Sequence, residues 1–370
     1  MHLRPAFAFL ILVGISGCVN QSTTIPAAIT HTYHGTASVG DFLNITVNST
    51  ALTITYTNLS NGESGTVPYI VNANGSYTIN DPTGNLLSAY EVPGYAMMFQ
   101  SAKSGPDHNT PALITAVESG PISLSTFANH SYNYMSFRTS YGGLEIGSVS
   151  IGSTSATNTN YWPYGNTNSG TGGAFGGGPM DFSGMAEDAS GTYMSGSVGG
   201  AGGGTDYIFG TTGGFFIVDS PNGSIIGLPK AASPAFDPSV AGTYSGIFYE
   251  KLNANNSGST ETGTPSTGQA TIVIDSLGNI TVTDSNNVTI ISALLTPVAS
   301  SSNLYGTGSD GKLTDPCYGL FTFHKVTGTY EHDVFVTFVG NSVVFSKYSV
   351  TLPWVENTGT YTYWYGVGLK

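Results

Sequence analysis

The stretch Leu43-Asn44-Ile45-Thr46-Val47-Asn48 alternates strictly between apolar and polar residues, and this pattern decides the fold class. Successive side chains of a β-strand point to opposite faces of a sheet, so the stretch places three aliphatic residues on one face. The same period of two recurs at residues 52–56, 272–274, 280–282, 321–323 and 334–338. Turn-forming pairs such as Asn61-Gly62 separate these segments. The sequence therefore predicts an all-β protein of antiparallel strands.

Composition excludes several functional classes. The 370 residues include 9 Lys and Arg against 22 Asp and Glu, for a net charge of −13. Nine basic side chains are too few to neutralise a phosphate backbone, and we therefore expect no nucleic-acid partner. Only 8% of residues are charged, against roughly a quarter in typical soluble domains, which argues against a coiled coil. Aromatic residues make up 12%, which argues against a disordered chain.

The body divides into two or three predicted sandwich or small-barrel modules. A β-rich region covers residues 31–232, as one module or as two (31–127 and 128–232), and a C-terminal β domain covers 240–370. The two-module division depends on a weak repeat in which Tyr33 and Tyr132 open similar units, with Tyr244 opening the last domain. Residues 165–214 contain 18 glycines, and we expect long Gly-rich loops there because glycine loses the most entropy on ordering.

The N-terminus has the features of a secretory signal. Arg4 precedes a run of roughly ten apolar residues, which is too short to span a bilayer as a helix of about 20 residues. Small residues then lead to Cys18. We expect residues 1–17 to be a signal peptide.

The run Ile15-Ser16-Gly17-Cys18 resembles the lipobox of bacterial lipoproteins. The resemblance covers only the signal region, and it implies lipidation of Cys18 by a diacylglyceryl group and a further acyl chain such as palmitate. Residues 18–30 would then be a lipidated tether, because two or more acyl chains anchor a protein stably. Val19 follows in place of an inner-membrane-retaining Asp, which favours the outer membrane in a Gram-negative source. An ordinary signal peptide, cut elsewhere, is the alternative.

Aromatic residues are the candidate ligand-binding groups. Trp162 and Tyr164 flank the Gly-rich range, and Tyr361, Tyr363 and Tyr365 alternate near the C-terminus. A solvent-facing stripe of tyrosines could stack against sugar rings. The alternative is that the three tyrosines fill the last strand of the core.

Histidines and carboxylates do not form a recognisable metal or cofactor motif. His324 and His332 flank a predicted hairpin tip at Thr327-Gly328, and only a three-residue loop would place them opposite one another. Two imidazoles are too few for a zinc site. Glu331 and Asp333 alternate with His332 and therefore point to the opposite face. The sequence predicts surface histidines, no metal site and no cofactor.

Catalytic residues are not predicted either. Asp181, Glu187 and Asp188 are close in sequence, but proximity in a loop does not provide the facing geometry of a glycoside hydrolase. Cys317 is expected to be a buried structural thiol. The sequence therefore favours an envelope-anchored lipoprotein with a structural or adhesive role, or one that binds carbohydrate or envelope proteins. A polysaccharide-acting hydrolase and a β-barrel that binds solutes or spans the outer membrane are the alternatives.

Overall fold

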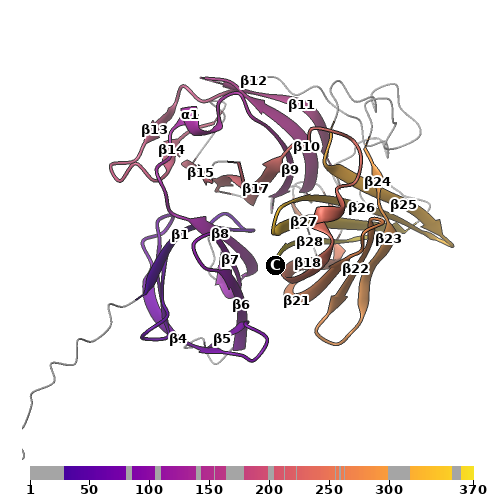
Figure 1. Ribbon diagram of the computed structural model, residues 1–370, viewed down its shortest axis with the longest axis horizontal. Helices are drawn as coiled ribbons and strands as arrows, with labels where there is room; N and C mark the ends of the chain where they lie inside the picture. The colour runs from indigo at the N-terminus through magenta and orange to yellow at the C-terminus, as the bar shows by residue number, and fades with distance from the viewer. Residues whose placement is uncertain are drawn as a thin grey trace, which may run out of the picture.

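Three large antiparallel sheets and one two-stranded ribbon make up the described part of the chain, in a computed structural model (Figure 1). Apart from strands, this part contains one four-residue helix, α1 (Leu124–Phe127), and one 3-10 turn (Pro238–Val240). The prediction of an all-β fold with barrel-like and sandwich-like modules is confirmed. The structure describes residues 29–80, 86–104, 110–138, 143–153, 155–163, 179–198, 204–211, 213–221, 223–254, 256–257, 260–261, 263–298, 317–351 and 360–370.

The first sheet is a closed barrel of eight strands, each paired with the next along the chain. The pairing of the last strand with the first closes it, with Tyr33 opposite Glu118. Inward-facing residues such as Ile45, Val47 and Ile54 are buried, as the alternation predicts. The strands are β1 (Thr30–Ala37), β2 (Phe42–Asn48), β3 (Thr53–Asn58), β4 (Ser64–Val71), β5 (Tyr77–Asn80), β6 (Leu86–Val92), β7 (Ala96–Ser104) and β8 (Thr110–Glu118).

The middle sheet has nine strands in the order β12-β11-β10-β9-β17-β16-β15-β14-β13. Its first and last long strands, β9 and β17, are neighbours at its centre. The strands are β9 (Ser131–Arg138), β10 (Gly143–Ile151), β11 (Ser155–Pro163), β12 (Pro179–Asp181), β13 (Met185–Glu187), β14 (Met194–Gly196), β15 (Asp206–Gly210), β16 (Phe216–Ser220) and β17 (Gly223–Pro229).

The C-terminal sheet has the order β23-β22-β21-β18-β28-β27-β26-β25-β24. Only Leu295 separates β23 from β24 in the chain, yet these strands lie at the two ends of that order, so the sheet curls around its own core. The strands are β18 (Gly242–Ala254), β21 (Thr264–Ile274), β22 (Asn279–Asp284), β23 (Thr289–Leu294), β24 (Thr296–Pro297), β25 (Leu320–Thr327), β26 (Tyr330–Val339), β27 (Ser342–Thr351) and β28 (Tyr361–Leu369), with a separate ribbon of β19 (Asn256–Ser257) and β20 (Thr260–Glu261).

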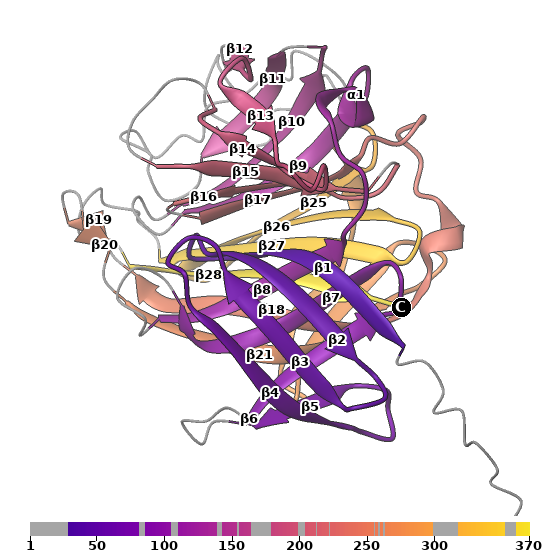
Figure 2. The same cartoon turned by 90° about the vertical axis from the view of Figure 1, so that its left-hand side faces the viewer.

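All three sheets contribute to one shared hydrophobic core. Phe42 of the barrel lies 5.2 Å from Phe209 of the middle sheet, measured between ring centroids. Phe137 of the middle sheet lies 4.8 Å from Tyr249 and 5.7 Å from Tyr363 of the C-terminal sheet. Figure 2 shows the middle sheet above the barrel and the C-terminal sheet behind the barrel. Aromatic contacts therefore hold the three sheets together.

The range 165–214 differs in part from the predicted Gly-rich loops. It contains four short strands, β12 to β15. Phe182, Met185 and Met194 are buried in the core of the middle sheet, and this apolar area supports strands among the glycines. Residues 164–178 and 199–203 lie outside the described residues, so the loop expected at 172–178 does too, as does the loop expected at 199–204 except for Gly204.

Some glycines inside strands are required by the aromatic ring of the neighbouring strand. Gly366 pairs with Phe345, and a Cβ atom on Gly366 would lie 2.3 Å from Phe345 Cζ. Gly268 pairs with Phe248 in the same way, at 2.4 Å. The rings cover the bare backbone and replace the missing side chain. Part of the high glycine content therefore belongs to packed strands.

A buried carboxyl group joins the barrel to the middle sheet. Asp219 of β16 is 1% exposed, and its Oδ1 accepts a hydrogen bond of 2.5 Å from the Thr36 hydroxyl of β1. Burial, together with the nearby carboxylates of Asp41 and Asp206, raises the pKa of Asp219 well above its ordinary value. The folded protein therefore retains a proton that the unfolded chain releases.

We expect Asp219→Asn to reduce the dependence of stability on pH. Because the unfolded chain binds fewer protons above about pH 4, wild-type stability falls as the pH rises from there toward the folded-state pKa. Asparagine retains the acceptor for Thr36 without titrating. Thermal unfolding between pH 4 and 8 should show a smaller decline for Asp219→Asn, while Glu187→Gln, at an exposed carboxylate, keeps the wild-type decline. An unchanged slope in Asp219→Asn would contradict the assignment.

Tyr363 should be among the most important side chains for stability, because it is fully buried where two sheets meet. Tyr363→Ala would leave a large cavity, and we expect it to lower the free energy of unfolding by about 3–5 kcal/mol. Tyr330→Ala is the matched control, since Tyr330 is 51% exposed and should change stability by about 0.5 kcal/mol or less. Urea denaturation of both variants measures the difference, and equal effects would show that Tyr363 is not a core residue.

Candidate binding site at the C-terminal sheet

A cavity of about 330 Å³ lies at one end of the C-terminal sheet, over strands β18, β26, β27 and β28. It is on the face of the sheet that carries Val334 and Phe345, which belong to the sheet's own core. Its lining combines aromatic rings with neutral hydrogen-bonding groups and one lysine. The lining residues are Asn253, Tyr330, His332, Lys347, Ser349, Thr351, Thr360, Tyr361, Thr362 and Trp364.

Trp364 is held in position by a partly buried network of polar contacts. Its indole N–H donates a hydrogen bond of 2.8 Å to Glu250 Oε2, and the Ser266 hydroxyl donates to Glu250 Oε1 at 2.7 Å. Lys347 Nζ lies 4.6 Å from the centroid of the indole ring and donates to the Ile290 carbonyl oxygen at 2.7 Å. Burial lowers the pKa of Lys347. The ring is therefore fixed before any ligand arrives, which reduces the entropy cost of binding.

His332 provides a second fixed polar group. Its Nδ1 lies 2.7 Å from the Ser349 hydroxyl, and its ring is nearly parallel to that of Tyr330, with centroids 6.2 Å apart. Burial, followed by the charges of Lys347 and Lys325, lowers the pKa of His332. The imidazole is therefore neutral at pH 7, with one nitrogen that donates and one that accepts. Such a group can bind a hydroxyl in either role.

The predicted tyrosine stripe faces inward. Tyr361, Tyr363 and Tyr365 are at most 1% exposed and belong to the core that the three sheets share. Their expected role as a solvent-facing platform for sugars is therefore corrected in favour of the alternative, a core strand. The physical reason is that β28 is a central strand with a sheet packed on the tyrosine face. Only Tyr361 also borders the cavity.

Trp364 lies on the other face of the same strand, between Tyr363 and Tyr365. The alternation along β28 separates it from the tyrosines. Period two places residues on two faces but does not say which face is covered. The useful signal was Thr362 and Trp364 together, a polar and an amphipathic residue on one face.

The remaining residues predicted to bind a ligand or a lipid do not line this cavity in the described part of the chain. Trp162 lies in β11 and pairs with Ile146, and its side chain is not described. Tyr164 and Cys18 lie outside the described residues. Within the described ranges, no helix has both the length and the apolar character needed to cross a bilayer.

Cys317 is buried between sheets, as predicted for a structural thiol. It is fully inaccessible, and its Sγ lies 2.9 Å from the Ser148 hydroxyl of β10. Ser148 also donates to Asn133 Oδ1, whose amide group donates to the Tyr318 carbonyl oxygen. These hydrogen bonds attach the segment before β25 to the middle sheet.

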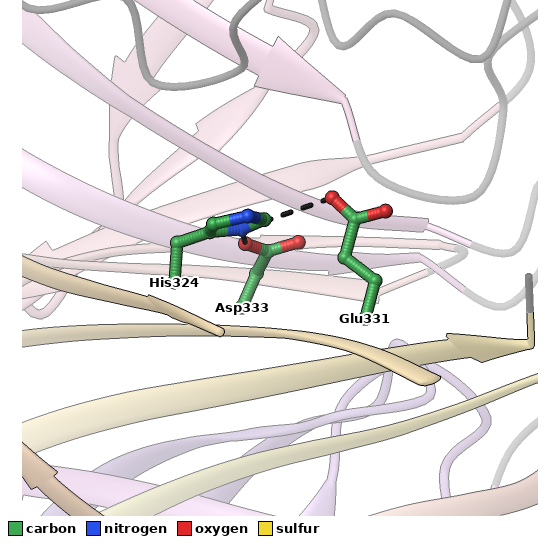
Figure 3. A group of neighbouring side chains, drawn as sticks. All are labelled: His324, Glu331 and Asp333. Atoms are coloured by element: carbon green, nitrogen blue, oxygen red, sulfur yellow. Dashed lines mark hydrogen bonds and ion pairs between the residues drawn. The ribbon is translucent and has the colours of Figure 1, made fainter. Parts of the chain in front are cut away.

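A second polar cluster lies on the opposite face of β26, where His324, Glu331 and Asp333 meet (Figure 3). His324 Nδ1 is 2.7 Å from Asp333 Oδ1 and 3.7 Å from Glu331 Oε1. Asp333 is buried, and desolvation raises its pKa to about 6 although His324 opposes the shift. Both carboxylates lie on the face away from His332, as predicted from the sequence, but their contact with His324 was not expected.

Comparisons with known proteins assign no family. No family model matches the chain, and no curated protein matches it. In structure the chain is similar to a double mutant of transferrin-binding protein B from Haemophilus parasuis Hp5, with 9% identity, a TM-score of 0.25, and coverage of 92% of this chain and 76% of that one. It is also similar to the isotype 1 transferrin-binding protein B from serogroup B Neisseria meningitidis, with 9% identity, a TM-score of 0.24 and coverage of 90% and 66%. Similarities this low leave the function to the geometry of the site.

Proposed function

We propose that this protein is an envelope-anchored lipoprotein that binds carbohydrate in the cavity of its C-terminal sheet. The observation that carries the proposal is the fixed indole of Trp364 beside the polar groups of His332, Ser349 and Lys347 in one concave site. Ligand sites typically combine aromatic walls with a few fixed polar groups in this way.

The chemistry of a sugar matches the lining. A pyranose has an apolar C–H face that packs on an aromatic ring, and hydroxyls at its edge that both donate and accept hydrogen bonds. Trp364 provides the ring, and the side chains of His332, Ser349, Thr362 and Asn253 provide donors and acceptors. A volume of about 330 Å³ is at the lower end of ligand sites, so it suits one or two sugar units.

Binding without hydrolysis is the version of this function that the lining favours. Among the described residues that line the cavity, there is no carboxylate. Glu250 approaches from behind Trp364, where its two oxygens accept hydrogen bonds from Trp364 and Ser266. Glycoside hydrolysis typically needs two carboxyl groups on either side of the scissile bond. We therefore expect oligosaccharides to be bound and released intact.

The lipid anchor would hold this site at the membrane surface. The lipobox-like run that ends at Cys18 supports it, and residues 18–28 would connect the acylated cysteine to the barrel, whose first strand begins at Thr30. Two or more acyl chains make such anchoring stable. The protein would then present its cavity to glycans of the envelope or its surroundings.

Trp364→Phe and Trp162→Phe together test which aromatic residue binds the ligand. We expect Trp364→Phe to weaken carbohydrate binding at least about tenfold, because it removes part of the stacking surface and the hydrogen bond that orients it. Trp162→Phe, at one of the two aromatic groups suggested by the sequence, should leave affinity unchanged. Isothermal titration with a panel that pairs each neutral sugar with its uronic acid measures both variants and shows whether Lys347 selects acidic sugars.

Three results would contradict the proposed site. Equal losses in both variants would mean that the cavity is not the binding site, and loss only in Trp162→Phe would move the site to the middle sheet. The third result is the release of shorter products from glycans incubated with the protein, which would show that it hydrolyses them. The circular dichroism spectrum of each variant must match that of the wild type, so that a change in fold is not mistaken for the loss of a contact with the sugar.

Cys18→Ala tests the anchor. The thiol is the atom that would be acylated, so the variant should incorporate no palmitate analogue and should leave the membrane fraction or retain its signal peptide. Metabolic labelling of cells that express each form measures this, with Cys317→Ala as the matched cysteine control. Equal labelling of wild type and Cys18→Ala would exclude the lipobox.

A further inference from the structure

We infer that His324, Glu331 and Asp333 form a binding site for a divalent transition-metal ion, with zinc as the best match. The three ligand atoms all lie within 4.8 Å of one another on one face of the β25–β26 hairpin. Figure 3 shows the imidazole and the two carboxylates rising from the same side of their strands and converging. This site is separate from the carbohydrate cavity, which lies on the other face of β26.

The hairpin register creates the cluster. Thr327 pairs with Tyr330, so the loop is the two residues Gly328 and Thr329, and Gly328 has φ +61° at the first loop position. That conformation is typical of a tight type II′ turn, which fixes the register of both strands. His324 then lies directly opposite Asp333, on the same face.

Glu331 joins the same face because it is two residues from Asp333. Asp333 pairs with Tyr348 on its other side, which continues the face into the shared core and explains its burial. The side chains of Glu331 and His324 are 27% and 47% exposed, so solvent can reach the cluster from one side. The site therefore has a rigid buried ligand, two outer ligands and a path of entry.

The ligand distances suit an ion held between them. Zinc binds histidine nitrogen and carboxylate oxygen at about 2.0–2.2 Å, which places tetrahedral neighbours about 3.4 Å apart. The distances from His324 Nδ1, 2.7 Å to Asp333 Oδ1 and 3.7 Å to Glu331 Oε1, bracket this value. Small rotations of the two outer side chains would therefore admit the ion. Coordination through Nδ1 requires the proton of neutral His324 to be on Nε2.

The donor set selects the class of ion. One imidazole and two carboxylates suit zinc, manganese or cobalt, whereas calcium takes six to eight oxygen ligands and magnesium keeps most of its water. Three protein ligands leave at least one position for water, as in open zinc sites. An ion there would also balance two carboxylates that lie close together, one of them buried.

Cobalt titration tests the site, because Co²⁺ replaces zinc in such sites and absorbs visible light when bound. The sample is the full-length chain in detergent, without a histidine tag. We expect one Co²⁺ per chain, displaced by zinc and not by excess calcium or magnesium. Two variants, His324→Gln and Glu331→Gln, should each weaken binding at least about tenfold, and both side chains are exposed enough to tolerate the change.

His31→Gln is the matched control. His31 Nδ1 lies 3.8 Å from Glu118 Oε1, so it is a histidine–carboxylate pair like the proposed site, and the described residues place no third ligand beside it. This variant should bind Co²⁺ as the wild type does. A wild type that binds no Co²⁺ overturns the proposal, and so does binding that survives both His324→Gln and Glu331→Gln. Sugar binding is measured in parallel, so that failure of either proposal is seen separately.

Discussion

The arrangement depends on the pairing of the last strand, β28, between β18 and β27 at the centre of the C-terminal sheet. Alternate side chains of a strand point to the two faces of its sheet, so those of β28 enter two different environments. One set, the tyrosines 361, 363 and 365, enters the core shared with the middle sheet. The other set, with Thr362 and Trp364, reaches the cavity. The same pairing therefore joins the sheets and builds the candidate binding site.

Several of the few titratable side chains of this protein hold neighbouring elements together through hydrogen bonds. Glu250 orients Trp364 from behind the cavity, and Asp219 accepts a hydrogen bond from Thr36 across the junction of the barrel with the middle sheet. His34 does the same at that junction, where its Nδ1 lies 2.6 Å from Asn44 Oδ1 and its Nε2 lies 2.8 Å from Thr192 Oγ1. A buried polar group without such a partner would cost free energy, so these contacts specify how the sheets meet.

The two proposed sites use opposite faces of β26. His332 lines the cavity, and its neighbours Glu331 and Asp333 lie on the opposite face of β26, which carries Phe335 of the shared core. A loop one residue longer at Gly328 would shift the register of the hairpin and place His324 opposite His332. His324 would then lie on the face away from the two carboxylates. The two-residue turn therefore decides which polar residues meet, and neither site requires the other to be occupied.

Local sequence was sufficient to predict the long alternating strands, but not the short strands β12 to β14 among the glycines. Alternation in residues 43–48 and 334–338 indicated period two, and glycine or asparagine marked the turns, because both signals act between near neighbours in the chain. Tyr33, Tyr132 and Tyr244 also marked the first strand of each sheet, where all three are buried.

The tertiary structure alone decided which face of each strand is covered. Tyr363 and Trp364 are adjacent in sequence, and only the packing of the middle sheet on one side makes the first a core residue and the second part of a cavity wall. Likewise, His324 and Asp333 meet only through a register set by one turn. Periodicity separates the residues of a strand into two faces, but long-range packing decides which face is buried. A single sequence does not show directly which distant sheet packs on that face.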